Sequence, residues 1–129
     1  MKKLLLISTL LFSTVMFSSP SYGEWTKLSE NVNGRIYYVD FERIRKHDGY
    51  VYYWTLSDYL KPSKYGDLSE RLYNQGDCKI FRWKILSYSF HKEPMGEGTG
   101  EIQEPVNKSW QYPPPNSSAE TILKQVCSE

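Results

Sequence analysis

The first 23 residues constrain the fold most, because they determine the compartment in which the rest of the chain folds. Two lysines precede an apolar run of 14 residues, Leu4 to Phe17, and Ser21 and Gly23 place small side chains before Glu24. This order predicts a secretory signal peptide, residues 1–23, cleaved after Gly23. The run is shorter than the about 20 apolar residues that a membrane span needs. We therefore expect an exported, soluble mature chain in the periplasm or, alternatively, secreted or at the cell surface.

Export changes the interpretation of the two cysteines. Outside the cytoplasm a pair of cysteines is normally oxidised, and the spacing of Cys78 and Cys127 fits neither a Cys-x-x-Cys redox pair nor a zinc site. We predict a structural disulfide between them, with Cα atoms about 5–6 Å apart. Closing a loop of this length contributes roughly 4 kcal/mol in the chain-entropy treatment. Neither cysteine lies at the cleavage site, so we expect no lipid anchor there.

The mature chain, residues 24–129, has the length of one domain with a modest hydrophobic core. Two of the 16 Lys and Arg residues lie in the signal, which leaves 14 against 15 Asp and Glu. A net charge this close to zero, without a long basic run, argues against a nucleic-acid partner and against a polybasic membrane module. The densest basic segment, residues 43–46, has acidic neighbours and is interpreted as a solvated turn.

Most of the mature chain has the composition of β-strands. Strands are predicted over residues 25–30, 35–39, 50–60, 68–73 and 78–91, from their β-branched and aromatic content. Asn33-Gly34 suits a primed hairpin turn, in which both residues take positive φ, and Asp48-Gly49 is a second turn signal. Residues 40–46 are expected to form a short helical turn or a loop, with Asp40 as its cap.

The strand predicted over residues 78–91 changes its apolar side. Two sets of apolar residues alternate on opposite faces: Phe81, Trp83 and Ile85, then Leu86, Tyr88 and Phe90. A β-bulge near Ile85 and Leu86 would shift the alternation by one residue and keep both sets facing the core. The alternative is a sheet that is covered on both faces.

The clearest helix signal follows Pro115. Ser117 and Glu120 have the spacing of a capping box. A single apolar stripe at helical spacing follows, formed by Ala119, Ile122, Leu123, Val126 and Cys127. Because Cys127 lies on this stripe, its disulfide would join the helix to the sheet. We therefore predict an α+β fold, an antiparallel β-sheet of about five or six strands with one C-terminal helix packed on it.

One helix is too narrow to cover such a sheet, since a helix is about 10 Å across and the sheet roughly 25 Å wide. The many aromatic residues must then be hidden by sheet curvature, by loops or by a second subunit in a homodimer. Tyr50, Tyr52, Tyr53 and Trp54 place rings on both sides of one strand. Tyr50, Tyr52 and Trp54 are candidate partner-binding residues of a surface expected to be aromatic and polar rather than basic. Alternatively, these rings fill the core of a curved sheet.

The sequence offers little catalytic chemistry. Its two histidines, His47 and His91, lack helical metal-ligand spacing, and there is no Gly-x-Ser-x-Gly elbow. Asp58, within an aromatic strand, is interpreted as a hydrogen-bonded structural residue. The glycines at 96, 98 and 100 do not lead into a convincing helix, so a nucleotide loop is not predicted. We therefore expect no catalytic site, no cofactor and no metal.

The order of strands, turns and cysteines resembles the surface-adhesin protein E-like family. The residues that carry the resemblance are Tyr37-Tyr38-Val39-Asp40, Ile44, Gly49, Trp54-Thr55-Leu56-Ser57-Asp58-Tyr59, Lys61-Pro62, Ser69, Asp77-Cys78, Leu86-Ser87-Tyr88, Trp110, Pro115-Asn116-Ser117, Glu120 and Val126-Cys127. They span almost all of residues 25–128. The resemblance implies a small exported bacterial domain, an antiparallel sheet flanked by a C-terminal helix, and a disulfide between the two cysteines. The family's named member is an adhesin that binds host matrix proteins.

The resemblance also implies a lipid anchor and a basic contact region before the first cysteine. This chain has no cysteine for such an anchor. In the segment from Pro62 to Cys78, Lys64, Tyr65 and Arg71 are further candidate contact residues, although three acidic residues accompany them.

Three functions are compatible with these patterns. The first is an exported bacterial binding module, without enzymatic activity, that recognises a protein or an envelope component. The second is a periplasmic inhibitor of a hydrolase, with the loop from Glu93 to Glu104 as the segment that enters the target's cleft. The third is a small hydrolase, which requires His91 or His47 to approach a serine and a carboxylate in the fold.

Overall fold

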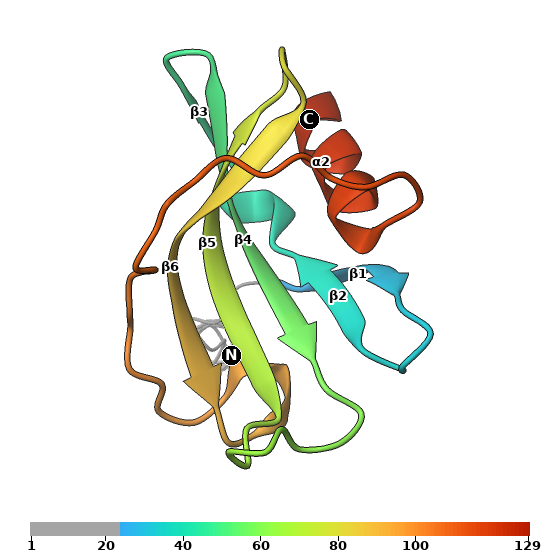
Figure 1. Cartoon of the computed structure of the whole chain (residues 1–129), viewed down its shortest axis with the longest axis vertical. Coiled ribbons are helices and arrows are strands. Elements are labelled where there is room, and N and C mark those ends of the chain that lie inside the picture. Colours follow the sequence, from blue (N-terminus) through green and yellow to red (C-terminus); the bar gives the residue numbers. More distant parts are fainter. Residues whose placement is uncertain (1–23) are drawn as a thin grey trace, which may run out of the picture.

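The computed structural model describes residues 24–129, and the predicted signal peptide lies outside the described residues. One antiparallel sheet contains six strands: β1 (Thr26–Glu30), β2 (Ile36–Val39), β3 (Arg45–His47), β4 (Tyr50–Asp58), β5 (Ser69–Asp77) and β6 (Arg82–His91). Their order is β1-β2-β4-β5-β6, and β3 pairs with β4. The helix α2 (Ser118–Ser128) packs on one side of the sheet (Figure 1). This arrangement confirms the predicted fold class.

The first hairpin turns differently from the prediction. Of the Asn33-Gly34 pair only Gly34 has a positive φ, +83°. The Asn31 side chain closes the loop instead, because its Oδ1 accepts the amide hydrogens of Asn33 and Arg35, both at 3.0 Å. An Asx-type contact therefore replaces the primed turn.

The segment after β2 contains both a helical turn and an additional strand. Asp40 caps the 3-10 helix η1 (Phe41–Arg43) as predicted, and its Oδ1 accepts the amide hydrogen of Glu42 at 3.1 Å. The strand β3 was not predicted, because its three residues, Arg-Lys-His, lack apolar alternation. It is held by pairing with β4 across the Asp48-Gly49 turn, in which both residues have positive φ.

The boundaries of the long strands differ from the prediction around the first cysteine. β5 continues to Asp77, whereas residues 78–81 form a turn and not the start of β6. Asp77 Oδ1 accepts the amide hydrogens of Lys79 and Ile80, both at 3.1 Å, and Phe81 takes a φ of +64°. The hydrogen bonds of the Asp77 side chain therefore hold residues 78–81 in a turn, and β6 begins only at Arg82, later than the apolar pattern suggests.

The predicted bulge in β6 is confirmed. Tyr73 lies opposite Ser87, but Asn74 lies opposite Ile85, so Leu86 is the extra residue. Opposed residues in an antiparallel pair share a face. The face that carries Asn74 therefore also carries four apolar residues of β6, two on each side of the bulge: Trp83, Ile85, Tyr88 and Phe90.

The core lies between that face and α2. Its buried members are Val39, Val51, Tyr53, Ile122, Leu123 and Val126. Gly76 allows the close approach of the helix, because a Cβ atom there would lie 2.9 Å from both Leu123 and Val51. Ser117 caps α2, and its Oγ accepts the amide hydrogen of Glu120 at 3.1 Å. The other half of the predicted capping box is shifted by one residue, since Glu120 accepts from the Asn116 amide.

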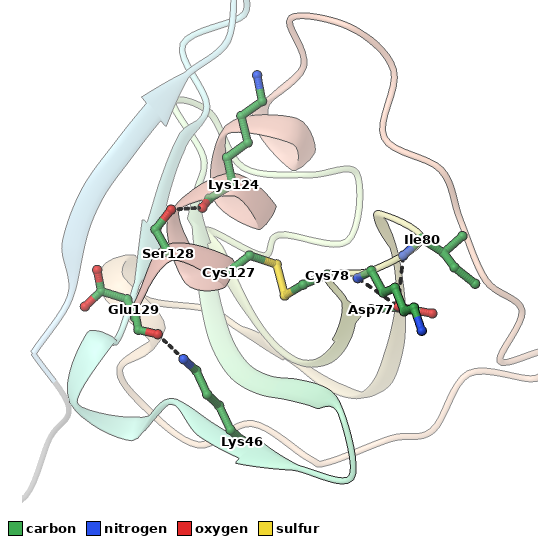
Figure 2. Close-up of a disulfide and its surroundings, with 9 residues drawn as sticks. Lys46, Asp77, Cys78, Ile80, Lys124, Cys127, Ser128 and Glu129 are labelled. Atoms are coloured by element: carbon green, nitrogen blue, oxygen red, sulfur yellow. Dashed lines mark hydrogen bonds between the residues drawn. A yellow bond between two sulfur atoms is a disulfide. The ribbon is translucent and has the colours of Figure 1, made fainter.

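The disulfide joins the end of α2 to the turn after β5 (Figure 2). The Cα atoms of Cys78 and Cys127 are 5.7 Å apart, within the predicted range. In the same region the Lys46 ammonium donates to the Glu129 carbonyl oxygen, so β3 also contacts the C-terminal end of the helix (Figure 2).

The connection between η2 (Pro94–Gly96) and α2 runs along the outer side of β6 (Figure 1). It pairs with that strand at two points, Gln103 with Tyr88 and Gln111 with Trp83. None of the helices among residues 24–129 is long and apolar enough to cross a membrane.

Candidate functional site

The two faces of the sheet differ in what covers them. Side chains alternate along β4, so Val51 and Tyr53 enter the core under α2 while Tyr50, Tyr52 and Trp54 point to the other side. We call the side that packs on α2 the helix face and the opposite side the open face. Tyr53 is only 2% exposed, whereas the three rings of the open face are half-buried. The predicted binding residues of β4 therefore share the open face.

Five aromatic rings on the open face form two contacting groups, one of Tyr50 and Trp110 and the other of Tyr52, Tyr73 and Trp54. We call these five rings the aromatic row. The Tyr73 ring centroid lies 4.8 Å from that of Trp54 and 6.3 Å from that of Tyr52. The Trp110 ring lies 5.8 Å from Tyr50. The row thus crosses several strands and includes a residue from the connection before α2.

Basic side chains accompany the aromatic row on the open face. The Arg82 guanidinium carbon and the Lys84 ammonium lie 4.3 and 4.5 Å from the centroid of Trp110, within cation–π distance. Arg45 on β3 is paired opposite Tyr52 and is exposed. Among residues 24–129, the only carboxylate in an ion pair with these residues is Asp77, 3.0 Å from Arg82.

The sequence did not identify Tyr73, Arg82, Lys84 or Trp110 as members of this surface. Tyr73 has a usable signal, because it lies opposite Trp54 once the pairing of β4 and β5 is known. Arg82 and Lys84 can be assigned to the same side of the sheet only when the register of β6, including its bulge, is known. Trp110 lies in an irregular segment, and no local pattern places its ring over β6.

Arg71, a predicted contact residue, also lies on the open face. It is paired opposite Leu56 on β4 and Ser89 on β6. Its side chain lines a small hollow of about 140 Å³. We call this cavity the Arg71 hollow, and its other lining residues include Trp54, Ser87, Ser89, Gly100 and Ile102. The structure therefore brings Arg71 together with Trp54 at one edge of the aromatic row.

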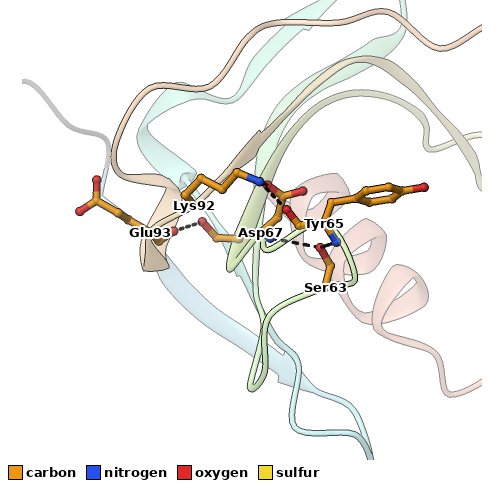
Figure 3. A network of polar contacts seen from close by, with 6 residues as sticks. Ser63, Tyr65, Asp67, Lys92 and Glu93 are labelled. Atoms are coloured by element: carbon orange, nitrogen blue, oxygen red, sulfur yellow. Dashed lines mark hydrogen bonds and ion pairs between the residues drawn. The ribbon is translucent and has the colours of Figure 1, made fainter.

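Lys64 and Tyr65 are not part of this surface. They lie in the loop between β4 and β5, at the end of the sheet away from the β3–β4 turn (Figure 1). Tyr65 is 71% exposed, and its carbonyl accepts a hydrogen bond from Lys92, which also pairs with Asp67 at 3.1 Å (Figure 3). Ser63 closes the same loop through the amides of Tyr65 and Asp67 (Figure 3).

The helix face contains a larger groove of about 710 Å³ between the sheet, the first hairpin and the start of α2. Tyr53, Trp83 and Ile122 are among its apolar lining residues. On its floor, Asn74 Nδ2 donates to Thr55 Oγ1 at 3.1 Å and to the Tyr53 carbonyl at 3.3 Å. Buried polar groups in this groove are therefore satisfied within the protein itself.

Glu70, one of the two acidic residues that line the groove, is also compensated internally. Burial raises the pKa of Glu70, against the opposing influence of Arg35 and of hydrogen bonds from Tyr59 and Ser57. Arg35 Nη1 lies 3.6 Å from the Glu70 carboxylate, and the Arg35 guanidinium stacks on the Tyr59 ring at 4.3 Å. Arg35 and Glu70 thus compensate each other's charge on the helix face.

The sequence of the chain matches one known protein family over nearly all of the described residues. Residues 25–128 match the family described as surface-adhesin protein E. The chain belongs to this family. Among curated proteins no sequence matches significantly.

Solved structures of the surface-adhesin protein E family have the same fold. Protein E of Haemophilus influenzae, in crystal form II, superposes with a TM-score of 0.59 at 19% identity, covering 87% of this chain and 94% of that chain. Protein E from non-typeable Haemophilus influenzae gives the same TM-score at 20% identity, covering 87% and 82%. The superposition shows a shared fold. Because the identity is this low, the binding surface has to be inferred from the residues of this chain itself.

A hydrolase would require a histidine close to a serine and to a carboxylate, and part of this arrangement is present. Ser89 Oγ and His91 Nε2 are 2.8 Å apart, but both residues are buried and His91 Nδ1 has no hydrogen-bond partner among residues 24–129. Burial and the charge of Arg71 lower the pKa of His91. The exposed His47 contacts Asp48. Within the described chain no group of three potential metal ligands occurs.

Proposed function

We propose that this protein is an exported bacterial binding module of the adhesin type, without enzymatic activity, that recognises a protein or an envelope component through its open face. The observation that carries the proposal is the aromatic row with Arg82 and Lys84, on the side of the sheet away from α2. Membership of the surface-adhesin protein E family supports the binding role.

The composition of the open face is that of a protein-binding surface. Tyr, Trp and Arg are enriched at interfaces, because each offers a large contact area and a polar group that can still form a hydrogen bond. They also dominate the residues whose truncation costs the most binding energy. The aromatic row consists only of Tyr and Trp, and Arg82 contacts it directly.

The predicted signal peptide supports an exported location, with residues 24–129 as the mature domain. The periplasm, the cell surface and the medium all agree with this proposal. The family name supports a surface location in particular.

The inhibitor function receives less support from the loop that would have to enter a hydrolase. The Met95 amide donates to Asp58, the Gly96 amide donates to Ser69 Oγ, and that hydroxyl donates to the Glu93 carbonyl. The first part of the loop therefore lies against the sheet. Its last part pairs with β6 through Gln103, so little of it is available to enter a cleft.

A capture experiment with matched variants tests the proposed surface. The purified mature protein is immobilised and exposed to cell-envelope and host extracellular-matrix preparations, and bound proteins are identified by mass spectrometry. We expect Trp54→Ala and Tyr52→Ala to abolish capture of the specific partner, while Tyr65→Ala, an exposed ring outside the open face, leaves it unchanged. Light scattering of the same samples determines whether a second copy of the chain covers this face.

The reverse result, loss of capture with Tyr65→Ala and retention with the two open-face variants, would transfer the site to the loop between β4 and β5. Circular dichroism of each variant separates loss of binding from loss of folding.

A further inference from the structure

The Arg71 side chain is held in place, but its charge has no acceptor in the part of the chain that the structure describes. Within residues 24–129, no hydrogen bond or ion pair joins its guanidinium to another residue. Its aliphatic stem packs against the chain at η2, because a Cβ atom on Gly96 would lie 3.1 Å from Arg71 Cδ. A partly buried charge without an acceptor is unfavourable. An anion in the Arg71 hollow would supply the missing partner.

The surroundings of the hollow also favour an anion. Ser87 and Ser89 contribute hydroxyl groups, and Trp54 forms an apolar wall. The nearby His91 is neutral near pH 7, since burial and the charge of Arg71 both lower its pKa. Arg71 is therefore the one charged residue among those that line the hollow.

The cations of β3 and β6 add positive charge to the open face, while Asp58, which β4 places on the same face, accepts the amide hydrogen of Met95. Lys84 and Arg45 form no ion pair with a carboxylate of the described chain, and Arg45 is held only by the carbonyls of Glu42 and Ile44. Asp77, the acidic residue next to this surface, is buried and already paired with Arg82. An acidic partner would complement this distribution, because electrostatic complementarity accelerates association and excludes basic competitors.

We propose that the open face binds an acidic segment of a protein, and that the Arg71 hollow receives one of its carboxylate side chains. This inference rests on the proposed function and specifies the chemistry of the partner. Arg71 forms a charge-assisted, two-pronged hydrogen bond with the carboxylate. Lys84 and Arg45 attract the remaining acidic residues, while the aromatic row contacts the apolar side chains between them.

A protein fits this surface better than an acidic glycan. Sugar rings bind aromatic side chains by lying on an uncovered ring face. In the aromatic row the rings lie against one another, with planes 27° apart for Tyr52 and Tyr73 and 35° apart for Trp54 and Tyr73. Both cations of β6 lie over the Trp110 ring. The hollow, at about 140 Å³, has room for one carboxylate side chain rather than for a sugar ring with its substituents.

The probe for this inference is a fluorescently labelled oligoglutamate peptide, added to the mature protein while backbone amide NMR signals and fluorescence anisotropy are recorded. We expect signals of residues 71, 87, 89 and 100 to shift, and the affinity to fall steeply as salt rises. Arg71→Gln should weaken binding about tenfold or more, because it leaves the carboxylate without its buried partner. Lys64→Gln removes the same charge outside the open face and should change the affinity less than about twofold.

Arg71→Lys is the second variant, in case the glutamine variant does not fold. It keeps the charge and most of the stem but loses the planar fork, so we expect intermediate weakening. Lys84→Gln should mainly reduce the salt dependence. Oligolysine of equal length, a heparin oligosaccharide and sodium sulfate complete the comparison.

Several results would overturn the inference. They are an absence of shifts at the hollow, equal weakening by Arg71→Gln and Lys64→Gln, binding of oligolysine equal to that of oligoglutamate, or tighter binding of the heparin fragment. Sulfate that matched the peptide would reduce the hollow to a site for small anions. Failure of these tests leaves the proposed function intact if Trp54→Ala still abolishes partner capture. Conversely, oligoglutamate binding at the hollow with normal capture by Trp54→Ala would refute the proposed function alone.

Discussion

The two faces of this sheet contain similar residue types but use them differently. On the helix face, Tyr53 and Trp83 pack against α2, and polar groups such as Asn74 find their partners inside the protein. On the open face, the rings of the aromatic row contact each other, while Arg71 and Lys84 have no carboxylate partner in the described chain. The helix face is therefore internally satisfied and contributes stability, whereas the open face retains unsatisfied charge that is available for recognition.

The largest expected effect tests whether stability is concentrated on the helix face. Replacing both Cys78 and Cys127 by serine opens a link between residues separated by 49 positions and should lower the free energy of unfolding by about 2–4 kcal/mol. Thermal and urea unfolding of the wild-type and variant proteins measure the loss. An unchanged melting temperature would mean that packing alone holds α2 in place.

Much of the helix face could be predicted from sequence because its signals are local. The cap at Ser117, the apolar stripe of α2 and the change of side at Ile85 and Leu86 each depend on residues that are neighbours in the chain. The disulfide followed from the number of cysteines and from the predicted export. Each of these features was confirmed, because local geometry and the final packing agree.

The open face could be predicted only in part, because its members meet through strand pairing and through an irregular connection. Alternation along β4 correctly grouped Tyr50, Tyr52 and Trp54. Trp110 reaches the same surface from a segment without secondary structure of its own, so no periodicity reveals it. Lys64 and Arg71 appeared equivalent in sequence, but in the structure Lys64 lies in a loop and Arg71 lies in a strand of the sheet.

Two titratable residues, the buried His91 and the half-buried Glu70, allow the faces to be compared by pH. On the open-face side, burial and Arg71 lower the pKa of His91 from its ordinary value of 6.5, so the unfolded state binds protons more readily below that pH. Stability from a neutral His91 is present above 6.5 and is lost as the pH falls through the folded pKa. On the helix face, burial raises the pKa of Glu70 above 4.5, which has the opposite consequence.

We therefore expect opposite pH responses from variants on the two sides. As the pH falls from about 7 to about 5, the wild type should lose stability relative to His91→Gln. The stability of the wild type relative to Glu70→Gln should be greatest near and below pH 4.5. This difference should decrease as the pH rises through the folded pKa of Glu70. Urea unfolding at a series of pH values measures both differences. Parallel curves for the wild type and either variant would exclude that residue as the source of the pH dependence.

The smallest expected effect concerns the open-face cations, and it sharpens the division between stability and recognition. Lys84 contributes to folding only through its contact with the Trp110 ring, 4.5 Å from the centroid, which at an accessible site is worth about 0.5–1 kcal/mol. Lys84→Ala should therefore lower the free energy of unfolding by no more than about 1 kcal/mol. Lys124→Ala, which breaks the 3.8 Å pair with Glu120 on α2, is a matched control expected to cost about 0.3–0.5 kcal/mol. If Lys84→Ala instead destabilised the protein as much as loss of the disulfide, the cations would be structural. The open face would then have to be regarded as a second core rather than as a binding surface.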